Sequence, residues 1–174
     1  MSINKLSQIS TKKGDTGTSK NYSNEEYSKD YTIFEVLGTI DELSSFLGLT
    51  YHYWESQLIK TIQEHLQRIS SQIATNPNSK NYHKLEKITE DETTILEDFI
   101  KVYLRKYPLN NTFYLPGSEK SKAGAYLDVS RAITRRSERR LVALEKLEKR
   151  TDLKEIKMYL NRLSDLLFVL SINS

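Results

Sequence analysis

The chain has 174 residues, a length that suits one domain able to bury roughly two-thirds of its unfolded surface. Its 26 lysines and arginines nearly balance 23 acidic residues, so a strongly positive site must come from local clustering. The absence of cysteine excludes disulfides, thiolate metal sites and cysteine nucleophiles. No apolar run reaches the roughly 20 residues that span a bilayer, and no secretory signal is recognisable. We therefore expect a cytoplasmic protein without membrane contact, although a mature organellar form would look the same.

The spacing of apolar residues predicts an all-α fold. Only six glycines and three prolines occur, and apolar residues recur at helical spacing over long stretches. The predicted helices cover about residues 32–53, 56–74, 89–107, 121–149 and 153–172, and the polar segment 76–87 is expected to be a surface loop. Helices of this length with short connections favour a five-helix up-and-down bundle, with residues 1–174 as its single domain.

One stripe of the first predicted helix carries small residues and one acid: Gly38, Asp41, Ser45 and Gly48. Small side chains at this spacing let a neighbouring helix approach closely. The pattern places Asp41 at such a contact.

The fourth predicted helix holds an arginine cluster. At about 100° per residue, one face carries Arg131, Arg135, Glu138 and Arg139 beside Asp128, while Arg136 and Arg140 point roughly the other way. A solvated charged face with ion pairs explains this pattern about as well as a binding site does. The apolar positions Ala125, Val129, Ala132 and Leu144, however, could cover the core only with Arg131 or Arg135 close to it, which favours a partner such as Asp41.

Residues 11–19, Thr-Lys-Lys-Gly-Asp-Thr-Gly-Thr-Ser, combine glycines, hydroxyls and lysines ahead of the first helix. Such a loop can surround phosphates, because glycine lets backbone N–H groups approach oxygen atoms while the lysines supply charge. It is not a Walker A sequence, and a glycine-containing disordered tail is the more frequent explanation of such a segment.

Several segments together resemble the ATP:cob(I)alamin adenosyltransferases of the propanediol-utilisation type. They are the loop from Thr11 to Gly17, Leu-Gly-Thr-Ile-Asp-Glu-Leu-Ser-Ser-Phe-Leu-Gly from residue 37, and Phe-Tyr-Leu-Pro-Gly from residue 113. Arg-Ala-Ile-Thr-Arg-Arg-Ser-Glu-Arg-Arg from residue 131 and Tyr-Leu-Asn-Arg-Leu-Ser-Asp-Leu-Leu-Phe-Val from residue 159 resemble the family's last two helices. The chain departs from the family pattern at Ser118, at Asp128, where a histidine is typical, and in a longer segment before the arginine helix.

The resemblance implies a set of site residues. In the N-terminal segment, residues 1–30, those that bind ATP would be Thr11, Lys12, Lys13, Gly14, Thr18, Ser19 and Lys29. From the bundle, the same site would take Arg135, Glu138, Arg139 and Asn161. Arg131 would pair with Asp41, and Phe113 would shape the corrinoid pocket. No residue is assigned as a metal ligand.

The resemblance also implies the activity. The enzyme would transfer the 5′-deoxyadenosyl group of ATP to cob(I)alamin, with Mg²⁺, and release triphosphate. The protein would align the reactants, neutralise the leaving triphosphate and exclude water. Sites would lie between the subunits of a homotrimer, and contacts with a reductase and with an adenosylcobalamin-dependent enzyme would follow.

Two other hypotheses compete with this one. The arginine cluster could belong to a non-enzymatic module that binds RNA or another polyanion, or the chain could be a purely structural bundle. The interleaved acids Asp128, Glu138 and Glu145 argue against a phosphate-backbone stripe, so we expect no nucleic-acid partner.

Overall fold

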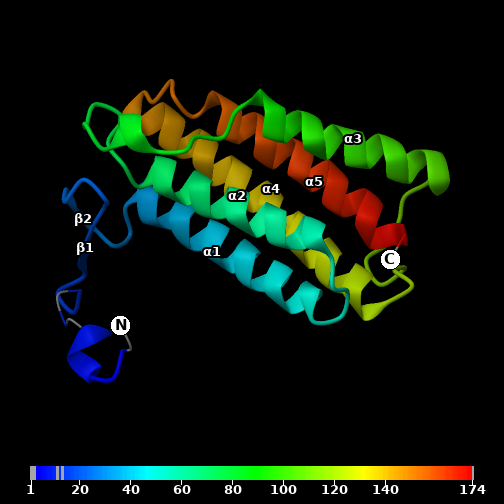
Figure 1. Ribbon diagram of the computed structural model, residues 1–174, viewed down its shortest axis with the longest axis horizontal. Coiled ribbons are helices and arrows are strands. Elements are labelled where there is room, and N and C mark those ends of the chain that lie inside the picture. The colour runs from blue at the N-terminus through cyan, green and yellow to red at the C-terminus, as the bar shows by residue number, and fades with distance from the viewer. Residues whose placement is uncertain (1–2, 11, 13, 174) are drawn as a thin grey trace.

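The computed structural model describes residues 3–10, 12 and 14–173, and its main body is a helical bundle in which consecutive helices run in opposite directions (Figure 1). The helices are α1 (Thr32–Tyr51), α2 (Gln57–Ile73), α3 (Glu90–Lys106), α4 (Lys122–Glu148) and α5 (Lys154–Asn173). α4 packs against both α1 and α5, while α2 covers α1 and α3 covers α5. The predicted five-helix bundle is confirmed, and each helix end lies within two residues of its predicted position. Among the described helices, none is long and apolar enough to cross a bilayer.

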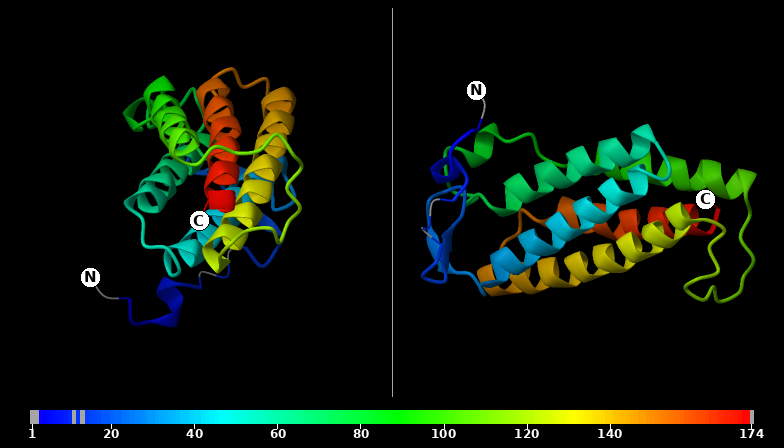
Figure 2. Two further views of the ribbon diagram at one scale, coloured as in Figure 1. Left: turned by 90° about the vertical axis from the view of Figure 1, so that its right-hand side faces the viewer. Right: turned by 90° about the horizontal axis from the view of Figure 1, so that it is seen from below.

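Small elements precede the bundle. Strands β1 (Thr18–Lys20) and β2 (Glu26–Ser28) form an antiparallel hairpin in which Thr18 pairs with Ser28. This hairpin lies at the end of the bundle where α1 begins, beside the α2–α3 connection (Figures 1 and 2). Strands of three residues carry too little alternation to be predicted from sequence, and neither strand was expected.

Two single turns of 3₁₀-helix complete the fold, η1 (Leu6–Gln8) and η2 (Tyr82–Lys84). η2 lies within segment 76–87, which was expected to be a plain surface loop. Its Tyr82 is buried, and the Tyr82 hydroxyl donates to Asp152 Oδ2 at 2.6 Å. One side chain of the predicted surface loop is therefore packed inside the structure.

The core face of α4 differs from the predicted one. Ala125, Val129 and Ala132 are exposed, whereas Leu127, Ile133, Leu141 and Leu144 are buried together with Ser130, Thr134 and Ser137. Each buried hydroxyl donates to the carbonyl four residues earlier, at 2.8 to 3.1 Å, which satisfies it within the helix. Arg131 or Arg135 was expected close to the core. Arg131 is partly buried, whereas Arg135 is exposed because the core face of α4 is rotated away from it.

The predicted capping box at the start of α3 is confirmed. The Thr89 side chain accepts from Asp91 N at 3.3 Å, and Glu92 Oε2 accepts from Thr89 N at 2.8 Å. Arg68 of α2 adds an ion pair to Glu92 Oε1 at 2.6 Å. Partial burial raises the pKa of Glu92, but the hydrogen bonds from Thr89 and Arg68 outweigh it and lower the pKa to about 2.

This lowered pKa predicts an acid-dependent loss of stability. Because the folded-state pKa lies below the ordinary value of 4.5, Glu92 contributes stability above pH 4.5 and loses it as the pH falls towards 2. Glu92→Gln should lower the free energy of unfolding by roughly 1–3 kcal/mol at pH 7. The difference from the parent should shrink between pH 4.5 and 2.5 in urea titrations.

The matched control is Asp98→Asn, which alters an exposed carboxylate on the same helix. It should follow the parent within about 0.5 kcal/mol at neutral pH. A Glu92→Gln deficit that stays constant down to pH 2.5 would contradict the assignment.

Candidate functional site

The arginines of α4 divide into two groups, as predicted. Arg136 and Arg140 turn towards α1 and form ion pairs with Glu42 and Glu35. These four side chains bridge the two helices, so Arg136 and Arg140 serve the fold. Arg131, Arg135, Glu138 and Arg139 lie on the other side of α4, and we call these four residues the arginine face.

Two guanidinium groups of the arginine face are exposed and have no partner in the part of the chain that the structure describes. Among the described residues, Arg135 and Arg139 form no hydrogen bond or ion pair. Between them in sequence, Glu138 Oε1 accepts from Asn161 Nδ2 of α5 at 3.1 Å. The structure therefore brings together Glu138 and Asn161, which the resemblance placed in the same site. Exposed guanidinium forks beside this pair can bind phosphate oxygens in a bidentate manner.

A pocket of about 210 Å³ lies at the other end of the arginine face, between the α3–α4 loop, α4 and α5. Its lining includes Phe113, which was predicted to shape the corrinoid pocket, and Arg131, which was predicted to pair with Asp41. Tyr114 and Phe168 form an edge-to-face contact in its wall, with ring centroids 5.9 Å apart. The complete lining is Thr112, Phe113, Tyr114, Leu115, Pro116, Glu119, Asp128, Arg131, Phe168 and Ile172.

Phe113 is 86% exposed, so it does not plug the end of the core. Tyr114 and Phe168 were not singled out from the sequence. An aromatic residue beside Phe113 in a polar loop was a usable signal for Tyr114. Phe168 gave none, since it fits the apolar spacing of α5.

Asp41 and Arg131 do not meet within one chain. Arg131 Nε donates to Asp128 Oδ1 at 2.7 Å, one turn earlier on the same helix. Asp41 is exposed and lines a groove of about 460 Å³ between α1 and α2, together with Lys60 and Gln63. The predicted pairing of Asp41 with Arg131 therefore requires a second subunit and stays a prediction.

The small-residue stripe of α1 is only partly covered. Gly48 approaches α2, where an added Cβ would lie 3.4 Å from Gln63 Nε2. Gly38, Asp41 and Ser45 remain exposed. The close helix neighbour expected at Asp41 is not supplied by the same chain.

Of the predicted N-terminal residues that the structure describes, Gly14, Thr18, Ser19 and Lys29 lie in or beside the hairpin. A Cβ added to Gly14 would lie 2.9 Å from Lys29 Nζ, so the lysine ammonium lies close to this loop. Lys29 N donates to Gly17 O at 2.9 Å, and the Thr18 hydroxyl donates to Glu26 Oε1 at 2.8 Å. Ser19 lies next to Thr18 in β1. Lys12 is exposed with φ of 57°, and Thr11 and Lys13 lie outside the described residues.

The hairpin and the arginine face are separated in one chain. The hairpin lies beyond the bundle end where α1 begins, whereas Arg135 and Arg139 lie near the middle of α4 (Figures 1 and 2). Each chain thus presents two incomplete groups of candidate phosphate ligands.

Comparisons with known proteins agree with this geometry. The cobalamin adenosyltransferase family matches residues 9–173. The chain is 39% identical to the corrinoid adenosyltransferase MMAB of Bos taurus over 96% of this chain and 71% of that protein. It is 38% identical to a corrinoid adenosyltransferase of Bacillus subtilis strain 168, over 80% of this chain and 72% of that protein.

Solved structures show the same likeness. A variant PduO-type ATP:corrinoid adenosyltransferase from Lactobacillus reuteri, complexed with cobalamin and ATP, superposes with a TM-score of 0.83 at 28% identity. The match covers 93% of this chain and 88% of that chain. A second variant from the same organism, complexed with ATP, gives the same TM-score, and the match covers 95% of this chain and 92% of that chain.

The helical-bundle fold and the named relatives show that the chain is a transferase. It belongs to the cobalamin adenosyltransferase family, and its relatives include PduO-type enzymes. They give no support to the alternative of a polyanion- or RNA-binding module.

Because Arg135 is exposed, we expect it to contribute to ATP binding and not to the stability of the fold. Arg135→Ala should leave the free energy of unfolding within about 0.5 kcal/mol of the parent, because the side chain is exposed and unpaired. It should weaken ATP binding about tenfold or more through lost charge-assisted hydrogen bonds. Isothermal titration with ATP measures the affinity.

Arg105→Ala, which removes an exposed arginine of α3, is the matched control and should bind ATP as the parent does. Unchanged ATP affinity in folded Arg135→Ala protein would remove Arg135 from the site.

Proposed function

We propose that this protein transfers the 5′-deoxyadenosyl group of ATP to cob(I)alamin, with the residues of the arginine face and the hairpin as its ATP site. The observation that carries the assignment to these residues is the pair of unpartnered guanidinium groups, Arg135 and Arg139, beside the Glu138–Asn161 pair. In the reaction, a cobalt–carbon bond forms at C5′, the C5′–O bond breaks, and triphosphate leaves with the bonding electrons.

The leaving group needs positive charge rather than a protein nucleophile. Cob(I)alamin supplies the attacking electron pair, so the chain has to bind and orient ATP and stabilise charge on the departing triphosphate. Arg135 and Arg139 can do this from α4, with Lys12 and Lys29 from the N-terminal segment. Glu138 and Asn161, which hold each other at 3.1 Å, are suited to orient the nucleoside end or a bound ion.

Magnesium fits this arrangement as an ion carried by ATP. Mg²⁺ in nucleotide sites keeps most of its ligands from phosphates and water and needs only one or two carboxylates. Glu138 is the carboxylate that the arginine face offers. No group of three or more acidic, histidine or cysteine side chains is poised to hold a metal in the described part of the chain.

The corrinoid is assigned to the 210 Å³ pocket around Phe113 and Arg131. An exposed aromatic ring in this wall can lie below the corrin plane and exclude water or a lower cobalt ligand. Asp128, which already pairs with Arg131, would take the place of the histidine that is typical of the family.

A homotrimer would complete the site. The hairpin and the arginine face of one chain are apart, and Asp41 is exposed on α1, so a neighbouring subunit could supply each group with its counterpart, including Asp41 to Arg131. Residues 1–30 would then serve as the nucleotide-binding segment of a single 174-residue domain. A cytoplasmic or organellar location, a reductase and an adenosylcobalamin-dependent enzyme as partners also belong to this proposal.

The activity is tested by anaerobic incubation of the protein with chemically reduced cobalamin and Mg-ATP. The corrinoid spectrum should change to that of adenosylcobalamin, and one triphosphate should be released for each cobalt–carbon bond formed. Photolysis should then reverse the spectral change, since light cleaves this bond. A spectrum that stays at cob(I)alamin while ATP is bound would contradict the function.

The exposure of Phe113 separates a role in the pocket from a role in folding. Phe113→Ala should leave the melting temperature within about 2 °C, since truncating a core aromatic would instead cost roughly 3–5 kcal/mol. ATP affinity should match the parent. Turnover should fall sharply when protein-bound cob(II)alamin must be reduced first, and less when cob(I)alamin is supplied directly.

Leu115→Ala is the matched control for Phe113→Ala, because it truncates a second exposed apolar side chain of the same loop and pocket rim. It should lose less turnover than Phe113→Ala in the coupled assay. A stable Phe113→Ala protein with parental turnover in both assays would exclude Phe113 from the corrinoid pocket.

A further inference from the structure

A buried arginine outside the proposed ligand site lies in the α4–α5 connection. Arg150 is only 6% exposed, and its main-chain N–H donates to the main-chain carbonyl of Glu145 at 3.1 Å. The preceding Lys149 has φ of 54°, in the left-handed region that reverses the chain at the end of a helix. The reversal turns Arg150 inward. A guanidinium at this depth is costly unless its donors are satisfied.

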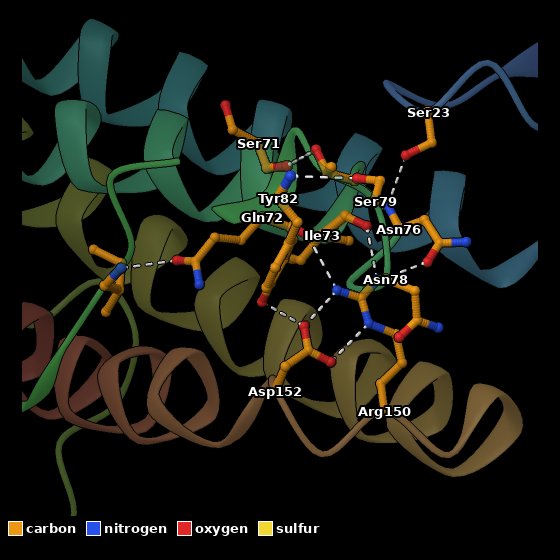
Figure 3. A network of polar contacts seen from close by, with 12 residues as sticks. Ser23, Ser71, Gln72, Ile73, Asn76, Asn78, Ser79, Tyr82, Arg150 and Asp152 are labelled. Carbon is orange, nitrogen blue, oxygen red and sulfur yellow. Dashed lines mark hydrogen bonds and ion pairs between the residues drawn. The ribbon is translucent and has the colours of Figure 1, made fainter. Parts of the chain in front are cut away.

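The surrounding groups satisfy it (Figure 3). Arg150 Nε and Nη2 donate to the two oxygens of Asp152 at 3.0 and 2.6 Å. Nη1 donates to Ile73 O at 3.0 Å, and Nη2 also donates to Gln72 O at 3.1 Å. Burial raises the pKa of Asp152, but the hydrogen bonds from Arg150 and Tyr82 outweigh it and lower the pKa, so the carboxylate stays ionised. A planar fork is required for this set of bonds, and lysine cannot reproduce it.

The two carbonyls that Arg150 binds belong to the last turn of α2, where helix geometry leaves carbonyls without partners. The hairpin is attached at the residues that follow. Tyr22 N donates to Ala74 O at 2.8 Å. Asn76 N donates to Ser23 Oγ at 2.9 Å, and Asn76 Nδ2 donates to Glu25 Oε1 at 2.6 Å. The end of α2 is therefore held on one side by Arg150 and on the other by the hairpin.

The hairpin carries the N-terminal residues of the proposed ATP site. Thr18 and Ser19 lie in β1, and Lys29 follows β2, with the strand register fixed by the pairing of Thr18 with Ser28. A displacement of the α2 end would move these side chains together. A second attachment, the stacked rings of Tyr27 and Tyr31 at 4.8 Å, would keep the hairpin from detaching completely.

We propose that Arg150 is a positioning residue for the nucleotide: it fixes the end of α2, and through Ala74 and Asn76 it fixes the hairpin that presents Thr18, Ser19 and Lys29 to ATP. This inference rests on the proposed function, because it takes the hairpin to be part of the ATP site. Arg150 itself does not touch the nucleotide.

The test compares Arg150→Met with Arg68→Met in the full chain. Arg68 is a matched control, since it also binds two main-chain carbonyls, Glu86 O and Lys87 O, and a carboxylate, Glu92. It joins α2 to the start of α3 rather than to the hairpin. Both variants should have lower melting temperatures than the parent.

Only Arg150→Met should weaken the binding of ATP. Its KM for ATP should rise about fivefold or more, while kcat at saturating ATP and the KM for cob(I)alamin should change less than twofold. Hydrogen exchange without ligands should be faster at the amides of residues 18–29 in Arg150→Met and parental there in Arg68→Met. An equal rise of the ATP KM in both variants would show that Arg150 contributes only to the overall stability of the fold, and would overturn the proposal.

Hydrogen exchange separates this inference from the proposed function, because it requires neither ATP nor corrinoid. Parental exchange of the hairpin in Arg150→Met would overturn the role of Arg150 whatever the protein catalyses. Faster exchange with an unchanged ATP KM would show that the hairpin lies outside the ATP site, and would overturn the ATP part of the proposal. If Arg150→Met does not fold, Tyr82→Phe replaces it, because this change removes only the hydroxyl bond to Asp152. Tyr82→Phe should raise the ATP KM about twofold and speed the hydrogen exchange of residues 18–29. An ATP KM and exchange rates equal to those of the parent would overturn the proposal.

Discussion

The rotation of α4 about its own axis is the constraint on which the rest of the structure depends. The buried face of this helix combines Leu127, Leu141 and Leu144 with the small hydroxyl residues Ser130, Thr134 and Ser137. Small side chains let α1 and α5 approach α4 closely, and because each hydroxyl is satisfied within the helix, their burial leaves no unpaired donor. The large apolar residues then fix which side of α4 faces inward.

Ion pairs on either flank of α4 agree with this rotation but do not set it. Arg136 and Arg140 reach α1, and Glu145 reaches Lys157 of α5 at 2.7 Å. Partly exposed pairs of this kind contribute roughly 0–1 kcal/mol each, well below the contribution of a buried leucine. They bridge α4 to its neighbours, whereas the rotation of α4 leaves Arg135 and Arg139 facing outward.

Helical periodicity was enough to predict the bundle, and it was not enough to predict how the site is assembled. The five helices and the capping box at Thr89 follow from signals within a few residues, so the sequence contains them. The division of the α4 arginines into two faces follows from the helical repeat. The polar core of α4 was missed, because serine and threonine at Ser130 and Thr134 do not count as apolar although they are buried.

Contacts between distant segments were beyond the reach of periodicity. Nothing in the sequence pattern indicates that Arg150 reaches the carbonyls of α2. The β-hairpin was missed for a related reason, since strands of three residues are stabilised by cross-strand pairs and by attachment to the end of α2 rather than by their own propensity. These tertiary contacts decide where the candidate ligand residues lie.

The separation of the hairpin from the arginine face has an electrostatic rationale. Arg135 and Arg139 lie in water in the single chain, where an unpaired guanidinium is well solvated and costs little. Bringing Lys12 and Lys29 beside them without an anion would place four like charges in one site, and the repulsion would grow as water is excluded. In the proposed site a polyphosphate would remove this penalty, because its charge would pair with all four groups and the attraction would strengthen in the same low-dielectric surroundings. An ATP site divided between two separate surfaces can therefore remain stable when empty and bind its anion strongly once both surfaces close around it.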